Sequence, residues 1–234
     1  LRTAHARERA AAEAMRDTPE GRARIRAETR TLVRRDARGA EESCRISLDG
    51  DVGHTARVLN LHIFHLLQTV SKNTAEIDAG VPARGLHGEA YRGHIFWDEL
   101  FIFPFLTLRI PELTRSLLRY RARRLDRARE AAAAEGFAGA MFPWQSGSDG
   151  SEETQTLHLN PESGRWLPDA SHLQRHINAA IVYNVWQYWQ VTTDLEFMRF
   201  WGAELVLEIA RFWASATTYD HQLDVAVGGI ELSL

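Results

Sequence analysis

The stretch Gly85–Leu106, GLHGEAYRGHIFWDELFIFPFL, decides the fold class. Its first half mixes glycine with histidine, arginine and glutamate, which is typical of a polar loop. Its second half is apolar and predicts a helix over about residues 96–108. Asp98, Glu99 and Pro104 interrupt this apolar run, which is also shorter than the roughly 20 residues needed to cross a bilayer. The stretch therefore indicates a core helix that follows a long loop.

Four further helices are predicted on either side of this stretch from the spacing of apolar residues. They cover about residues 59–70, 111–136, 171–190 and 198–212. The first is expected to be buried on nearly all faces, and Ser171 with Gln174 has the pattern of a capping box for the third. Because no run alternates convincingly between apolar and polar residues, we predict an all-α fold. The loops at 71–93 and 137–169 are long enough to suggest that they carry function.

The composition is that of a globular protein. Of the 234 residues, 44% are hydrophobic and 25% are charged, and the formal net charge is −3. The single cysteine, Cys44, excludes an internal disulfide and a cysteine zinc site. Residues 1–45 are rich in alanine and arginine and carry 12 arginines against 8 acidic residues. Because these charges are interleaved, we predict a solvated helical linker there and no nucleic-acid binding.

Trp97 and Asp98 form the pair with the clearest chemical meaning. A pyranose ring has an apolar C–H face and a rim of hydroxyls, so its site needs an aromatic plane beside a carboxylate that accepts hydrogen bonds. At the start of a helix, backbone N–H groups add further donors. The alternative is that Trp97 is a core residue and that Asp98 only caps the helix. Residue types alone leave both interpretations open.

The histidine pairs are interpreted as structural. His62 and His65 lie three residues apart on an apolar helix, and His87 and His94 lie seven apart in a loop. Neither pair has an evident third ligand, so no metal site is predicted. The segment SGSDGS at 146–151 lacks the lysine of a phosphate-binding loop, and we interpret it as a flexible loop near a site.

Three segments, in this order and spacing, resemble glycoside hydrolase family 65. They are GLHGEAYRGHIFWDELFIFPFL at 85–106, FAGAMFPWQS at 137–146 and HINAAIVYNVWQYW at 176–189. The helix LHIFHLLQTVSKN at 61–73 opens the resemblance, which covers about residues 45–215. The resemblance implies an (α/α)6 barrel of which this chain holds the first helices. Residues 46–234 are therefore predicted to form an incomplete (α/α)6 catalytic domain after the linker at 1–45.

The family contains inverting phosphorylases of maltose, trehalose, kojibiose and nigerose. The resemblance thus implies an α-linked glucose disaccharide and inorganic phosphate as substrates, with no cofactor. It also implies that Trp97 and Asp98 hold the non-reducing glucose. Around the same mouth it places Arg92, Trp144, Glu152 and His176. An acidic residue usually follows the histidine of this motif by three positions, but the residue here is Ala179.

The general acid of the family is a glutamate in a Gly-Pro-Asp-Glu motif, which this chain does not contain. Glu231 follows two glycines but lacks that context, so no catalytic residue is assigned. A phosphorylase needs only this acid because phosphate is already an anionic nucleophile, whereas an inverting hydrolase needs a second carboxylate. We therefore expect a phosphorylase fragment that is inactive alone. The alternatives are a hydrolase of the same family and a non-catalytic helical module that binds a sugar or a partner.

Two weaker expectations concern location and assembly. The chain shows no secretory signal and no membrane span, which favours the cytoplasm. An incomplete barrel would expose apolar faces, so a homo-oligomer is a further expectation.

Overall fold

The computed structural model describes residues 54–85, 88, 91–220 and 225–228. The chain divides into two compact units, Leu1–Asn60 and Leu61–Leu234, and helix α3 (His54–Leu67) crosses the boundary between them. All other described elements belong to the second unit. The predicted linker at 1–45 lies outside the described residues, so the domain boundary after it stays a prediction.

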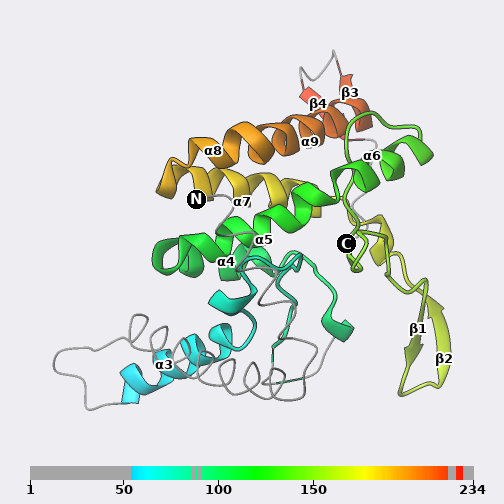
Figure 1. Cartoon of the computed structure of the whole chain (residues 1–234). Coiled ribbons are helices and arrows are strands. Elements are labelled where there is room, and N and C mark those ends of the chain that lie inside the picture. The colour runs from blue at the N-terminus through cyan, green and yellow to red at the C-terminus, as the bar shows by residue number, and fades with distance from the viewer. Residues whose placement is uncertain (1–53, 86–87, 89–90, 221–224, 229–234) are drawn as a thin grey trace, which may run out of the picture. The chain divides into compact units, whose positions relative to one another are not determined.

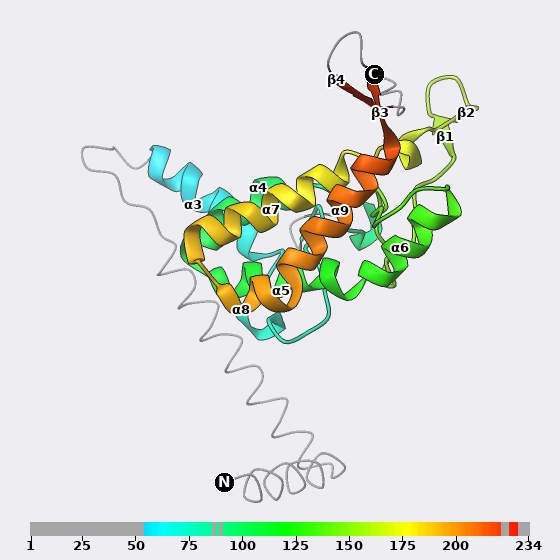
Figure 2. The same ribbon diagram turned by 90° about the horizontal axis from the view of Figure 1, so that it is seen from above.

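The second unit is built from helices that pack around α7 (Ile177–Thr192). This helix contacts α4 (Glu99–Arg109), α5 (Pro111–Arg123) and α9 (Ala203–Ala216), as Figure 1 shows. The remaining long helix, α6 (Leu125–Ala134), follows α5 and contacts α9 (Figure 2). The described chain is mostly helical, so the all-α class predicted from the sequence is confirmed.

Short helical turns complete the unit. They are Lys72–Thr74, Tyr91–Gly93, Ser171–Leu173, α8 (Leu195–Phe197) and a π-helix at Met198–Gly202. The π-helix runs directly into α9, so the helix predicted at 198–212 begins with a wider turn. The predicted apolar stripe of α9 is buried through Leu205, Ile209 and Phe212.

The ends of α5 and α6 follow from local sequence. Pro111 occupies the first turn of α5, where its missing N–H is not needed. Gly136 ends α6 with a left-handed φ of 82°, and the Phe137 N–H donates to the Ala132 carbonyl at 2.9 Å. This is the hydrogen-bond pattern of a glycine-terminated helix. The end predicted at Gly136 is therefore confirmed.

The single helix predicted over 111–136 is wrong, because the helix breaks at Arg124 (φ −105°, ψ 13°). The Arg124 guanidinium stacks on the Tyr120 ring, with 3.7 Å from Cζ to the ring centroid. It also donates to Asp78 at 2.8 Å and to the Ser148 carbonyl at 2.9 Å. These partners lie far away in sequence, so the local pattern of apolar residues does not reveal the break.

Helix α3 differs from its predicted environment. Ile63 is buried, but the side chains of Leu61 and Phe64 are 53% and 50% exposed. The expectation of a helix buried on nearly all faces is therefore wrong for this part of α3. No helix of the described residues is long and apolar enough to span a membrane.

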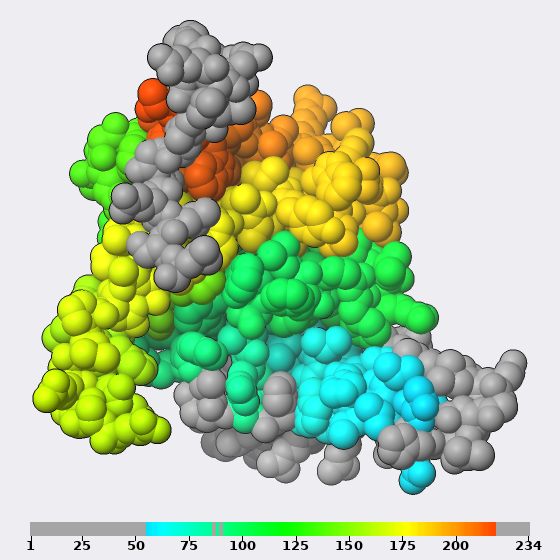
Figure 3. Space-filling model, turned by 180° about the vertical axis from the view of Figure 1, so that it is seen from behind, coloured from blue at the N-terminus to red at the C-terminus, as the bar shows by residue number. Residues whose placement is uncertain are grey.

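Two short antiparallel hairpins are additions that the sequence analysis did not predict. One pairs β1 (Leu157–Asn160) with β2 (Arg165–Pro168), and it projects away from the helices of the second unit (Figures 1 and 3). The other pairs β3 (Thr217–Asp220) with β4 (Val225–Gly228) directly after α9. The segment after residue 137 thus carries a hairpin rather than a continuous loop.

Candidate functional site

Three aromatic side chains from separate elements meet where α4 and α7 begin. Trp97 lies just before α4, Trp144 lies in the loop after α6, and His176 immediately precedes α7. The ring centroids are 5.7 Å apart for the two tryptophans. The His176 ring lies 5.2 Å from Trp97 and 5.0 Å from Trp144. Trp97 is 37% exposed, so this aromatic group presents an open ring that can pack on the apolar face of a ligand.

Backbone hydrogen bonds hold the segments of this aromatic group together. The Ile95 N–H donates to the Ser146 carbonyl at 3.1 Å, and the Ser146 N–H donates back to Ile95 at 2.9 Å. Asn178, in the first turn of α7, accepts the Phe142 N–H at 2.7 Å. The loop after α6 is therefore fixed both to the residues before α4 and to the start of α7.

Glu152 supports the aromatic group through the backbone of Trp144. Its carboxylate accepts the N–H of Trp144 at 2.7 Å and the N–H groups of Gln145 and Thr154 at 3.1 Å each. The sequence left open whether this carboxylate binds a sugar or is only solvated. In the structure its two oxygens receive backbone donors, so it holds the Trp144 loop in place. Direct contact with a sugar stays a prediction for this residue.

Asp98 does not use its side chain to cap α4. It occupies the N-cap position, but its carboxylate makes no capping hydrogen bond, and its backbone carbonyl accepts from Phe101 and Ile102 at 3.0 and 3.2 Å. The carboxyl is half-buried, and this desolvation raises the pKa of Asp98, while its own backbone N–H opposes the rise. The site thus holds a carboxylate next to Trp97 that the helix does not use.

His176 lies at the N-cap position of α7, which begins at Ile177. The capping box predicted from Ser171 is therefore wrong. Ser171 instead opens a separate turn, and its N–H donates to the Asp169 carboxylate at 2.8 Å. Burial lowers the pKa of His176, because desolvation disfavours the imidazolium. The ring is therefore neutral at neutral pH, with one nitrogen as a donor and the other as an acceptor.

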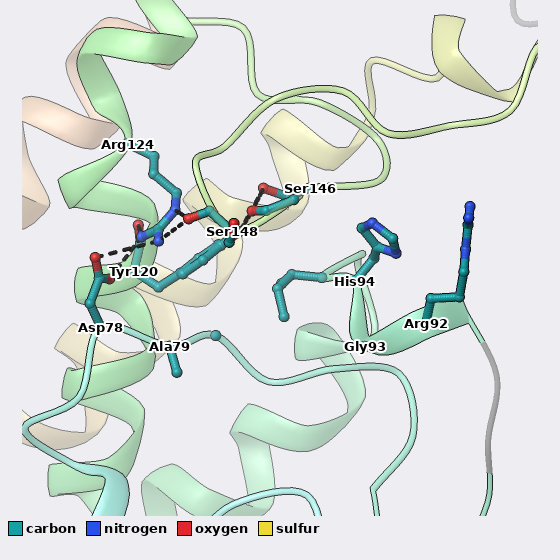
Figure 4. Close-up of a pocket in the computed structure, with 12 residues that line it drawn as sticks. Asp78, Ala79, Arg92, Gly93, His94, Tyr120, Arg124, Ser146 and Ser148 are labelled. Carbon is teal, nitrogen blue, oxygen red and sulfur yellow. Dashed lines mark hydrogen bonds and ion pairs between the residues drawn. The ribbon is translucent and has the colours of Figure 1, made fainter.

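Arg92 lies at a hollow that Trp97, Trp144 and His176 do not line. It lies in the turn Tyr91–Gly93 with a left-handed backbone (φ 52°, ψ 34°) and is exposed. It lines a hollow of about 400 Å³ that also contains Asp78 and Ser148. In Figure 4 its side chain points away from the Asp78–Arg124 ion pair on the other side of this hollow. Contact between Arg92 and a sugar stays a prediction.

The SGSDGS segment forms a turn whose residues Ser146, Gly147 and Ser148 line this hollow, and its predicted flexibility stays a prediction. The Asp149 carboxylate accepts the Ser151 N–H at 2.9 Å and the Ser151 hydroxyl at 2.8 Å, and these bonds lower the pKa of Asp149.

The histidine pairs were predicted to be structural. The described residues contain no group of three or more metal-ligating side chains. His65 pairs with Gln68 at 3.0 Å, whereas His87 and Glu231 lie outside the described residues.

Sequence reasoning missed several residues that shape the site. Phe96 packs edge-on against Trp144, with centroids 5.7 Å apart, and Tyr91 packs on Phe96 at 5.0 Å. Behind them lies a buried ion pair between Glu99 and Arg121. The aromatic residues could have been noticed from their position next to Trp97. The burial of Arg121 could not have been predicted, because this residue lies in an arginine-rich segment whose pattern is typical of a solvent-exposed helix face.

Comparison with known proteins assigns a family to this arrangement. Residues 60–230 match the family model of the glycosyl hydrolase family 65 central catalytic domain. An uncharacterized glycosyl hydrolase of Mycobacterium tuberculosis is 59% identical over 157 residues, which are 67% of this chain and 12% of that protein. The trehalose 6-phosphate phosphorylase of Lactococcus lactis is 47% identical over 150 residues, or 64% of this chain and 20% of the enzyme. The kojibiose phosphorylase of Caldanaerobacter subterraneus is 42% identical over 183 residues, which are 76% of this chain and 23% of that enzyme.

A solved structure supports the fold. It is a protein from the human microbiome that carries the provisional name of a kojibiose phosphorylase. Its TM-score is 0.52 at 24% identity, over 71% of this chain and 20% of that one. This likeness agrees with a partial helical barrel. The alignments cover less than a quarter of the length of each of these relatives. Because the family model matches most of its residues, this chain belongs to glycoside hydrolase family 65.

Proposed function

We propose that this chain holds the glucose-binding part of an inverting α-glucoside phosphorylase. In this proposal Trp97, Trp144 and His176 pack on the apolar face of the non-reducing glucose, and the Asp98 carboxylate accepts its hydroxyls. The observation that carries the proposal is the Asp98 carboxylate, which is half-buried beside the aromatic group and makes no capping hydrogen bond. A carboxylate that is kept partly desolvated and does not cap its helix is a candidate for binding.

For the whole enzyme we propose the chemistry of an inverting phosphorylase. An acid protonates the glycosidic oxygen while phosphate attacks the anomeric carbon from the opposite face, which gives β-glucose 1-phosphate. The names of two relatives, trehalose 6-phosphate phosphorylase and kojibiose phosphorylase, support phosphate as the nucleophile. The co-substrates proposed are thus an α-linked glucose disaccharide and inorganic phosphate.

A hydrolase of the same family is the second candidate function. A kojibiose hydrolase of Flavobacterium johnsoniae is 35% identical over 155 residues, so the shared segment serves both reactions among the relatives. Phosphorolysis and hydrolysis differ in the nucleophile, which approaches the opposite face of the sugar from the leaving group. The residues proposed here bind the glucose ring, and they serve either reaction.

Calorimetric titration with glucose tests the proposed site. We expect the parent to bind with a dissociation constant of about 1 mM, and Asp98→Ala to weaken binding at least tenfold, because the hydroxyls lose their charged acceptor. Glu162→Gln, which changes an exposed acid at the tip of the β1–β2 hairpin, serves as the control and should bind as the parent does. Equal binding by the parent and Asp98→Ala would contradict the site. Absence of binding in all three proteins would favour a non-catalytic helical module.

A further inference from the structure

A buried ion pair lies directly behind the proposed sugar site. The side chains of Glu99 and Arg121 are each 1% exposed. The Arg121 Nη2 and Nε atoms donate to Glu99 Oε2 at 3.1 and 3.2 Å. The other two end atoms, Glu99 Oε1 and Arg121 Nη1, are buried and have no hydrogen-bond partner in the described structure. Such a pair is expensive to bury, and an apolar pair of similar volume is often as stable or more so.

The Arg121 guanidinium also makes a bond that an apolar residue could not make. Its Nη2 donates to the backbone carbonyl of Phe96 at 2.9 Å. Phe96 immediately precedes Trp97, and Glu99 immediately follows Asp98. One guanidinium therefore holds the chain on both sides of the two proposed sugar-binding residues.

The residue beside Arg121 holds the second segment of the site. The Tyr120 hydroxyl donates to the Gly147 carbonyl at 2.6 Å and lies 2.7 Å from the Ser146 hydroxyl (Figure 4). Ser146 follows Trp144 by two residues and pairs with Ile95. Consecutive residues of α5 thus fix the loops of both tryptophans to one rigid element, which is how precise sites are supported.

We propose that Arg121, together with its buried partner Glu99, is a positioning residue that sets the place of Trp97 and Asp98 in the sugar site. This inference rests on the proposed function, since it assigns a role within that site. Arg121 touches no sugar in this scheme. It acts through the Phe96 carbonyl and through the first residue of α4, and loss of these bonds lets the Trp97 segment shift.

The test separates positioning from stability with a double variant. Glu99→Met with Arg121→Met replaces the ion pair by apolar side chains of similar length, so the chain should still fold cooperatively. We expect at least a tenfold rise in the glucose dissociation constant and a changed near-ultraviolet circular dichroism band, because the Phe96 bond is lost. Arg121→Lys keeps the charge but has no planar fork for two acceptors, so it should show a smaller rise.

Arg129→Met is the matched control, since the ion pairs of Arg129 are with Asp126 on α6 and with Glu204 and Glu208 on α9, not with the segments of Trp97 and Trp144. It should lower the melting temperature and leave glucose binding and the near-ultraviolet band unchanged. The inference is overturned if the double variant binds glucose as the parent does and keeps the parent's band. If the parent binds no glucose, the proposed function fails. The near-ultraviolet circular dichroism band alone then tests the inference, and the Trp97→Phe variant shows how the band changes when the Trp97 signal is lost. If the double variant does not fold, Arg121→Lys is judged by the same two readouts.

Discussion

At the residue scale, the partly buried position of Asp98 disfavours its ionised carboxylate in the folded state. Its half-buried carboxyl has a raised pKa, so between the ordinary and the raised value the native state binds more protons than the unfolded state. The free energy of unfolding therefore falls as the pH rises through this window. At neutral pH the native protein keeps a desolvated charge that contributes nothing to capping.

Asp98→Asn is therefore expected to raise the melting temperature at pH 7 by roughly 2 °C, which corresponds to about 0.5 kcal/mol in a domain of this size. The gain should shrink as the pH falls through the raised pKa and disappear well below the ordinary pKa of about 3.9, where the parent's carboxyl is protonated in both states. Thermal unfolding of the two proteins from pH 3 to pH 8 measures this difference.

Asp149→Asn is the control of opposite sign. The bonds from Ser151 lower the pKa of Asp149, so this variant should lose stability at neutral pH and approach the parent in acid. A gain at neutral pH from both substitutions would show that a general charge effect, rather than the environment of Asp98, is responsible.

The site was only partly predictable from residue types. Trp97 and Asp98 could be predicted as sugar-binding residues because a sugar site needs an aromatic ring beside a carboxylate, and these two residues are adjacent in the sequence. The approach of Trp144 and His176 depends on how α4, α6 and α7 pack, so only the family resemblance suggested it. The role of Glu152 in holding the Trp144 backbone and the burial of Arg121 are tertiary effects that no local pattern shows.

At the element scale, Gly139 lets the loop after α6 cross α9 at close range. Its φ is 73°, and a Cβ atom there would collide with the Glu208 carbonyl oxygen and the Phe212 nitrogen. The Ala140 N–H donates to the same carbonyl at 3.0 Å, so the contact fixes the loop. Gly136 has a similar φ of 82° but has no atom within 4 Å of the same position.

Alanine substitutions at Gly136 and Gly139 distinguish two costs. At Gly136 only the left-handed backbone is unfavourable, whereas at Gly139 the added Cβ atom would also collide with α9. Gly136→Ala should lower the free energy of unfolding by about 1 kcal/mol, the cost of a left-handed alanine. Gly139→Ala adds the displacement of α9, so it should cost roughly 2–5 kcal/mol in total. Urea unfolding of the two variants checks the ranking. Equal losses would mean that the loop moves freely over α9.

Helix ends set by local chemistry were predictable, whereas those set by distant partners were not. Pro111 and Gly136 act through their own backbone geometry, and both mark the ends that the sequence predicts. The break between α5 and α6 falls at Arg124, whose side chain binds Asp78 and Ser148, residues that lie far from it in the chain. The β1–β2 strands are four residues each, and such short alternation is hard to distinguish from a loop.

At the scale of the whole molecule, the chain exposes large apolar side chains on helices that otherwise form its core. Phe101 and Leu108 on α4 are 69% and 71% exposed, and Trp186 on α7 is 49% exposed. Exposed apolar clusters on soluble proteins mark surfaces for further contacts. A homo-oligomer stays a prediction.

We expect no turnover by this chain alone, because it holds the proposed glucose site without the family's acid motif. Incubation with maltose, trehalose, kojibiose and trehalose 6-phosphate, each with phosphate, should yield no β-glucose 1-phosphate above the level of a sample without protein. The Asp98→Ala variant provides the matched blank. Sustained release that depends on Asp98 would contradict the expected inactivity while supporting the glucose site.

The β1–β2 hairpin has one more consequence, which concerns how such a chain can change. Leu157 pairs with Pro168, and the Asp169 N–H donates to the Thr156 carbonyl at 2.9 Å, so the polypeptide returns to the place from which it departed. Residues can therefore be added or removed at the tip without altering the separation of Glu152 and His176. The hairpin is thus a tolerant point for insertion, where a reporter peptide could be grafted while the aromatic group keeps its spacing.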